Sequence, residues 1–202
     1  MNKQRAVFLD RDGTLNQDVG YAHRIEDLQL LDNVTAGLKR VQALGFELFI
    51  TTNQSGIARG YFTEAKMHAF NEAMLARLHK AGIVIRAIYF CPFHPTEGVG
   101  PYRCDSPLRK PRAGMIVQAA TEHDLDLATS FAIGDKKSDI VAGQAAGCRT
   151  ILLKTGAAGT GEPELVAEPD FFAADMLEAA RFIERTDANK TPVHTTAECS
   201  NL

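Results

Sequence analysis

Two carboxylates stand two residues apart in Asp10-Arg11-Asp12-Gly13-Thr14. The segment directly follows a short apolar run, residues 6–9, and Gly13 permits the tight turn with which such a run would end. Acidic side chains at a turn of this kind are suited to holding a divalent cation beside a phosphate group. An isolated Asp-x-Asp-Gly is equally well explained by a turn cap and a solvated acid, so the interpretation depends on what else lies nearby.

Three further polar segments carry groups that phosphate chemistry uses. A hydroxyl and an amide stand in Thr52-Asn53, two cations in Arg109-Lys110, and a further acid at Asp135. Each has an ordinary alternative: a turn hydroxyl, a surface charge and a helix N-cap. If the fold gathers them beside the acidic pair, a nucleophile, a metal site and neutralising cations are present together.

The hydrophobic pattern predicts elements that would gather them. Short apolar runs of strand length at 6–10, 47–52, 87–91, 130–134 and 150–154 alternate with helix-like segments at 34–44, 63–81, 113–123 and 138–146. This alternation predicts an α/β fold with a Rossmann-like, doubly wound parallel sheet. Ligands of such sheets bind at the carboxyl ends of the strands, where the polar segments above stand.

Composition and charge limit the class of protein and the kind of ligand. The chain has 202 residues, 22 basic and 25 acidic, a formal charge of −3 and 45% hydrophobic residues, which is typical of a globular domain. We expect one domain over 1–185 and a disordered polar tail over 186–202. The charge balance argues against nucleic acid and membrane partners and favours a small ligand. The chain shows neither a signal peptide nor a long apolar run, so a cytoplasmic location is expected, and four cysteines are too few for a disulfide scaffold.

The motifs together resemble those of the haloacid dehalogenase-like phosphatases: an Asp-x-Asp-Gly-Thr, a Thr after the second strand, a Lys, and a Gly-Asp. More specifically, the chain is similar to the heptose-1,7-bisphosphate 7-phosphatases and the related histidinol phosphatases over about residues 5–185. The segments that carry this likeness are 8–16 (FLDRDGTLN), 18–21 (DVGY), 52–60 (TNQSGIARG), 91–95 (CPFHP), 109–111 (RKP) and 134–136 (GDK).

The resemblance implies a Mg²⁺-dependent phosphatase acting through an aspartyl phosphate. Asp10 would be the nucleophile and Asp12 the acid and base. Asp10, the Asp12 backbone carbonyl and Asp135 would hold Mg²⁺, while Thr52 and Lys110 would contact the phosphoryl group and Arg109 the substrate. The implied substrate-binding residues are Asp18, Gly20, Tyr21, Asn53, Gln54, Ser55, Arg109, Lys110 and Lys136. Asp139 would orient water or lysine near the metal, with a helix-surface acid as its alternative.

Substrate selection in this superfamily usually depends on an inserted cap domain. The intervals before Thr52 and between Asn53 and Lys110 are too short for one, so we expect an essentially capless enzyme whose loops recognise a small phosphorylated sugar. A heptose 1,7-bisphosphate is favoured, because the fork of Arg109 suits a second phosphate. Histidinol phosphate and other small sugar phosphates remain the alternatives, and we expect the chain to act as a monomer.

A structural zinc is common in the relatives' substrate loop, held by Cys-x-His and Cys-x-Cys. Here Cys91, His94 and Cys104 form at best an incomplete site, with Asp105 as a replacement ligand, so a zinc-free loop is favoured.

Two readings outside phosphatase chemistry are weaker. A phospho-receiver would not place an acid two residues after its phosphorylated aspartate. The run 156–161 (GAAGTG) lacks the Gly-Lys-Ser/Thr ending of a nucleotide-binding loop and is taken as an ordinary loop.

Overall fold

A six-stranded parallel sheet organises the chain. The computed structural model describes residues 3–160, 162 and 164–188. The strand order is β3-β2-β1-β4-β5-β6, and every neighbouring pair is parallel. The strands are β1 (Ala6–Leu9), β2 (Glu47–Asn53), β3 (Ile85–Cys91), β4 (Phe131–Gly134), β5 (Arg149–Leu153) and β6 (Phe171–Ala173). The expected α/β class and doubly wound sheet are confirmed.

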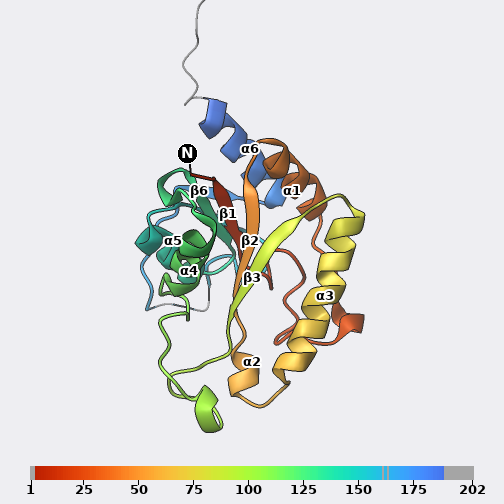
Figure 1. Cartoon of the computed structure of the whole chain (residues 1–202), viewed down its shortest axis with the longest axis vertical. Helices are drawn as coiled ribbons and strands as arrows, with labels where there is room; N and C mark the ends of the chain where they lie inside the picture. Colours follow the sequence, from red (N-terminus) through yellow and green to blue (C-terminus); the bar gives the residue numbers. More distant parts are fainter. Residues whose placement is uncertain (1–2, 161, 163, 189–202) are drawn as a thin grey trace, which may run out of the picture.

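Helices cover both faces of the sheet (Figure 1). On one face lie α1 (Val34–Ala43), α3 (Glu64–Lys80) and α6 (Met176–Ala188), and on the other α4 (Gly114–His123) and α5 (Lys137–Ala146). Strand β1 is buried on both faces: Val7 and Leu9 belong to the core under α1, α3 and α6, whereas Phe8 belongs to the core under α4. This two-sided burial explains why β1 reads as a continuous apolar run rather than an alternating one.

The five predicted strands and four predicted helices are confirmed to within about two residues at each end. Strand β6, helix α6 and the four-residue helix α2 (Ser55–Ala58) were not predicted. Helix α6 continues through Ala188, so the first three residues of the expected tail are helical. The remainder of that tail, 189–202, lies outside the described residues.

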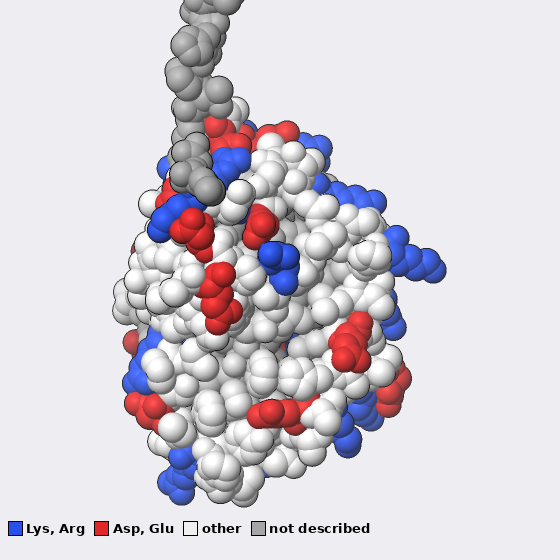
Figure 2. All heavy atoms as spheres, viewed as in Figure 1, with Lys and Arg blue, Asp and Glu red and all other residues white. Residues whose placement is uncertain are grey.

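The segments between the strands leave the site without a cap. The first interval holds α1 and a 3-10 turn, the second holds α2 and α3, and the 92–109 loop before α4 holds another 3-10 turn. The strands end toward α2 and this loop, at the lower end of Figure 1. On the face shown in Figure 2, acidic and basic side chains are interspersed around a largely uncharged centre. No helix among the described residues is long and apolar enough to cross a membrane.

Candidate active site

Three aspartates meet where β1 and β4 end side by side. The register pairs Leu9 with Ile133, so Asp10 and Asp135 leave adjacent strands close together, and the first turn of α5 adds Asp139. One carboxylate oxygen from each of these three residues lies within 4.8 Å of the other two, and all three residues are buried. Buried acids in such a cluster need cations, and oxygen ligands of this kind suit Mg²⁺.

Lys110 supplies one of those cations. Its Nζ lies 2.7 Å from Asp10 Oδ1 and 2.5 Å from Asp139 Oδ1. It also donates to the backbone carbonyl of Thr51 at 2.7 Å, so all three ammonium protons have acceptors. Asn53 fixes the Lys110 backbone, since its amide nitrogen donates to the Lys110 carbonyl at 3.0 Å and its oxygen accepts from the Lys110 N–H at 3.1 Å.

The three aspartates of the cluster differ in the pKa of their carboxyl groups. Burial alone would raise the pKa of Asp10, but Lys110 and Lys136 outweigh it and hold that pKa below its ordinary value. Burial, reinforced by Asp10 and Asp139, raises the pKa of Asp135 to about 7. Burial also raises the pKa of Asp139, to about 6, against the opposing effect of Lys110. Asp10 is therefore the permanently ionised carboxylate, as a nucleophile must be.

Glycines let these groups approach one another. Gly13 has a φ of +83°, and a Cβ there would lie 2.3 Å from Asp135 Oδ2. Gly134 is equally restricted, because its Cβ would lie 2.2 Å from Asp139 Oδ2. Only glycine fits at both places, so the Gly in each sequence motif is explained by direct contact with an acid of the cluster.

The Asp12 carboxylate lies outside the three-aspartate cluster and is held by Arg11. The Arg11 guanidinium donates from Nε to Asp12 Oδ1 at 3.1 Å and from Nη2 to Asp12 Oδ2 at 2.7 Å. Asn16 Nδ2 donates to Oδ1 at 2.9 Å and Gln54 Nε2 to Oδ2 at 3.2 Å. The Asp12 carboxylate is thus engaged by Arg11, Asn16 and Gln54 and is not part of the three-aspartate cluster.

Arg11 itself is completely buried, which the sequence does not predict. Besides Asp12 it donates to Asn71 Oδ1 at 3.1 Å and to the Ala22 carbonyl at 2.8 Å, and its guanidinium lies over the Phe70 ring at 4.7 Å. It therefore joins the Asp12 turn to α3 and to the loop after β1. No local sequence signal distinguishes this buried arginine from a solvated one.

Two adjacent cavities lie beside the acids. The inner cavity is lined by Asp10, Asp12, Thr52, Asn53, Lys110, Lys136, Ser138 and Asp139. The outer cavity is lined by Asp12, Asp18, Gly20, Tyr21, Asn53, Gln54, Ser55, Gly56 and Lys136. They share Asp12, Asn53 and Lys136. All the predicted site residues except Arg109 and Asp135 therefore line one cavity or the other.

Contacts across the outer cavity organise its walls. Lys136 Nζ lies 3.2 Å from Asp18 Oδ2, so the ion pair spans from the start of α5 to the loop after β1. The other Asp18 carboxylate oxygen accepts from the Gly20 N–H at 2.9 Å, which holds the turn that presents Tyr21. Gln54 Nε2 donates to Thr52 Oγ1 at 2.9 Å as well as to Asp12. The Gln54 amide therefore links the two cavities.

Arg109 lies beside the cavities within the 92–109 loop. It is half-buried and donates from Nη1 to the Phe93 carbonyl at 3.2 Å. Burial is the main reason that the pKa of Arg109 is lowered, with Arg59 adding to the effect. The structure thus leaves this predicted substrate-binding residue outside the two cavity linings.

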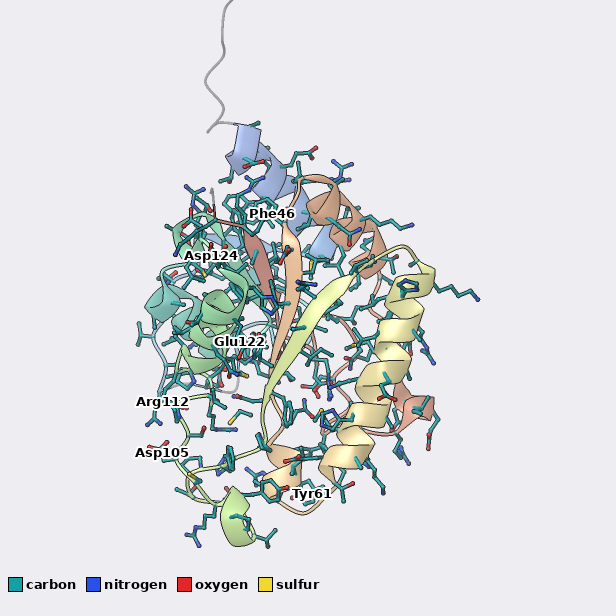
Figure 3. The ribbon with its side chains drawn as sticks, viewed as in Figure 1. Phe46, Tyr61, Asp105, Arg112, Glu122 and Asp124 are labelled. Atoms are coloured by element: carbon teal, nitrogen blue, oxygen red, sulfur yellow. The ribbon has the colours of Figure 1, made fainter. Side chains whose placement is uncertain are left out.

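The candidate zinc ligands do not converge. His94 Nδ1 accepts the Glu97 N–H at 2.9 Å, and burial keeps the pKa of the Cys91 thiol above its ordinary value. Cys104 is exposed, and Asp105 pairs with Arg112 at 2.7 Å on the outside of the loop (Figure 3). Among the described residues, only the three-aspartate cluster gathers three or more such ligands. These residues do not fit a tetrahedral zinc site.

Both the sequence and the fold of this chain are similar to those of known proteins. A family model described as HAD-hydrolase-like matches residues 107–179. Over 167 residues the chain is 46% identical to D-glycero-beta-D-manno-heptose-1,7-bisphosphate 7-phosphatase of Haemophilus ducreyi, which covers 82% of this chain and 91% of the relative. Over 151 residues it is 44% identical to the D-glycero-alpha-D-manno-heptose enzyme of Burkholderia mallei, covering 75% and 80%. The crystal structure of D,D-heptose 1,7-bisphosphate phosphatase from B. bronchiseptica, complexed with magnesium and phosphate, superposes with a TM-score of 0.80 at 30% identity, covering 91% of this chain and 99% of that one.

Proposed function

The chain belongs to the family of D-glycero-D-manno-heptose-1,7-bisphosphate 7-phosphatases, and from that premise we propose that it hydrolyses the 7-phosphate of such a heptose and retains the 1-phosphate. The observation that carries the proposal is the position of the Asp10 carboxylate, which lines the inner cavity with Lys110 2.7 Å from it and two further acids beside it.

Asp10 is the nucleophile in this proposal. Its carboxylate oxygen attacks phosphorus, the bond from phosphorus to the C7 oxygen breaks, and an aspartyl phosphate forms. A carboxylate and a phosphate dianion about 4 Å apart repel by roughly 8 kcal/mol at an effective dielectric near 20, so cations are needed. Lys110 and Lys136 line the same cavity as Asp10 and provide two of them, while the Thr52 hydroxyl provides a hydrogen bond to the transferring group.

Asp12 moves the protons. Protonated Asp12 gives its proton to the departing C7 alkoxide, and the resulting carboxylate then takes a proton from the water that attacks phosphorus. That second attack releases inorganic phosphate and regenerates both Asp10 and Asp12. The support for this role is the placement of Asp12 at the border shared by the inner and outer cavities, where the leaving oxygen must lie.

We assign Mg²⁺ to the acidic cluster, with Asp10, Asp135 and the Asp12 carbonyl as ligands. The donor set is entirely oxygen, and the glycine at position 13 keeps the space beside Asp135 free of a side chain. When bound, the ion would neutralise charge on the phosphoryl oxygens. Asp139 is better described as the second partner of Lys110, which it holds beside Asp10.

The outer cavity is the site proposed for the sugar. Asp18, Ser55 and the backbone around Gly20 offer hydrogen-bonding groups to heptose hydroxyls. Arg109, which lies beyond the lining, is the cation assigned to a second phosphate in this proposal. Contact with the transferring phosphoryl group would require Lys136 to exchange its ion pair with Asp18 for the ligand.

A substrate panel tests the proposal. Initial rates with Mg²⁺ would be measured on the alpha and beta anomers of the heptose 1,7-bisphosphate and on histidinol phosphate, with phosphorus NMR identifying the remaining phosphate. We expect kcat/KM for one of the bisphosphate anomers to exceed that for histidinol phosphate by about a hundredfold or more. A preference for histidinol phosphate, or release of the 1-phosphate, would refute it. Asp10→Asn serves as the control for contaminating phosphatases.

We further propose that the enzyme acts as a monomer in the cytoplasm. Every residue assigned to the reaction comes from one chain and the cavities need no second copy. The buried Cys91 and Cys148 are free thiols, which suits a reducing compartment. Size-exclusion chromatography with light scattering tests the first statement, and fractionation of cells tests the second.

A further inference from the structure

The glycine-rich run after β5 lies directly against the acidic cluster. The sequence alone predicts an ordinary loop here, and nothing in the proposed reaction uses it. In the structure the Ala157 N–H donates to Asp135 Oδ2 at 2.7 Å. The Gly159 N–H donates to the Asp135 backbone carbonyl at 2.7 Å, so the loop forms hydrogen bonds with both the main chain and the carboxylate of this acid.

The same loop also holds the turn that follows Asp12. The Thr155 hydroxyl donates to the Gly13 carbonyl at 2.7 Å across 142 positions of sequence. Residues 155–159, which we call the β5 loop, therefore contact two segments that carry proposed metal ligands. The turn and the acid come from different strands, and the β5 loop joins them.

Gly156 sits where these three segments meet. It has a φ of +53°, and a Cβ there would lie 2.3 Å from Asp135 Oδ2 and 2.6 Å from the Gly13 Cα. Neither neighbour can yield easily, since one is a backbone atom and the other belongs to a buried acid. A side chain at position 156 must therefore push the Asp135 carboxylate or the Gly13 turn away.

Few other contacts orient the Asp135 carboxylate. Among the described residues, the only donor to its second oxygen is the Thr14 hydroxyl at 3.5 Å, a weak hydrogen bond. The Ala157 N–H is thus the main donor that fixes the direction of this side chain. Hydrogen bonds to a ligating carboxylate usually set how well it presents its oxygens to a metal.

We propose that the β5 loop is a positioning element for the divalent cation, with Gly156 and Thr155 as the positioning residues that set Mg²⁺ affinity. The inference rests on the proposed Mg²⁺ site. It requires neither the heptose substrate nor the aspartyl phosphate, so it can be tested on metal binding alone.

Gly156→Ala is the principal variant, and Gly147→Ala is its matched control. Gly147 also has a positive φ, +84°, but a Cβ there would meet nothing within 4 Å, so the control also places alanine at a positive φ but without the clash. Thr155→Val removes only the hydroxyl donor, and Thr121→Val is its control, because the Thr121 hydroxyl donates to a carbonyl at 2.9 Å on the exposed surface of α4.

Mg²⁺ binding would be measured by isothermal titration calorimetry and Mn²⁺ binding by electron paramagnetic resonance, each without substrate. We expect Gly156→Ala to weaken binding about 10- to 100-fold, and Thr155→Val by up to about tenfold. Both controls should bind as the unaltered chain does. Circular dichroism establishes that each variant is folded.

Unchanged metal binding in folded Gly156→Ala would overturn the proposal, as would an equal loss in Gly147→Ala. If Gly156→Ala does not fold, Thr155→Val decides: weaker binding supports the proposal and unchanged binding overturns it. If the unaltered chain proves inactive on heptose bisphosphates but Gly156→Ala still weakens Mg²⁺ binding, this inference is upheld and the proposed function fails.

Discussion

Replacement of the buried Arg11 should damage both the fold and the acid-base step. In Arg11→Met the acceptors Asn71 Oδ1 and the Ala22 carbonyl lose their buried donor, and Asp12 loses its two-point partner. Two buried unsatisfied acceptors cost about 1–3 kcal/mol each. Because a domain of this size loses about 2–4 °C of Tm per kcal/mol, we expect Tm to fall by about 5–20 °C.

The catalytic loss should depend on the leaving group. Asn16 and Gln54 still hold the Asp12 carboxylate in the Arg11 variants, so the proton transfer is misaligned rather than abolished. A positioned general acid contributes about 10²- to 10⁴-fold, and we expect Arg11→Lys to lose about 100-fold in kcat/KM on the sugar bisphosphate. On p-nitrophenyl phosphate, whose leaving group departs without a proton, the loss should stay below about tenfold.

The assay compares kcat/KM for the two substrates, because this parameter reports only on steps through formation of the phosphoenzyme. Arg5→Met is the matched control: Arg5 also pairs with an acid, Asp187, donates to the Leu44 carbonyl at 2.8 Å and lies over the Phe46 ring at 4.3 Å. It should lower Tm without changing the ratio between substrates. An equal loss on both substrates in Arg11→Lys would refute the positioning role of Arg11.

Two further predictions concern metals. Burial and the neighbouring Asp10 and Asp139 raise the pKa of Asp135 to about 7. Protonation of Asp135 therefore stabilises the folded, metal-free protein. This stabilisation is complete below about pH 4 and is lost as the pH rises through about 7. The rise in Tm caused by Mg²⁺ should therefore grow between about pH 5.5 and about pH 8.5, and a rise independent of pH would contradict this assignment. For the 92–109 loop, Cys104→Ser should leave Tm and Mg²⁺-dependent activity unchanged. If the unaltered chain contains one equivalent of zinc and Cys104→Ser does not, the loop binds that metal.

The strand ends could be predicted because a parallel sheet converts order in the sequence into nearness in space. Asp10 and Asp135 each follow a short apolar run, and the pairing of β1 with β4 then places them together. The family resemblance drawn from these motifs is confirmed by relatives at 44–46% identity. Strand β6 is only three residues long, which is too short for its pattern to be distinguished from a loop.

Other features depend on partners that no local pattern announces. The burial of Arg11 requires Asn71 from α3 and the Ala22 carbonyl as acceptors. The proposed role of the β5 loop depends on its hydrogen bond to Asp135, a residue distant in the sequence. Helix α6 is different, because its signal was present. Its buried residues Met176, Ala179, Ala180 and Ile183 have helical spacing, and Asp175 accepts the Glu178 N–H at 2.9 Å at its start.

In the proposed reaction Asp10 becomes phosphorylated during turnover. Asp12→Asn should still form the phosphoenzyme from p-nitrophenyl phosphate and Mg²⁺, because that leaving group needs no proton, yet it should release phosphate slowly, because no base activates water. Rapid acid quenching followed by peptide mass spectrometry is the direct measurement. We predict one phosphoryl group on the peptide containing residue 10, absent in a chain that also carries Asp10→Asn. Release of p-nitrophenol without any phosphoryl group on that peptide would show that Asp10 is not the nucleophile.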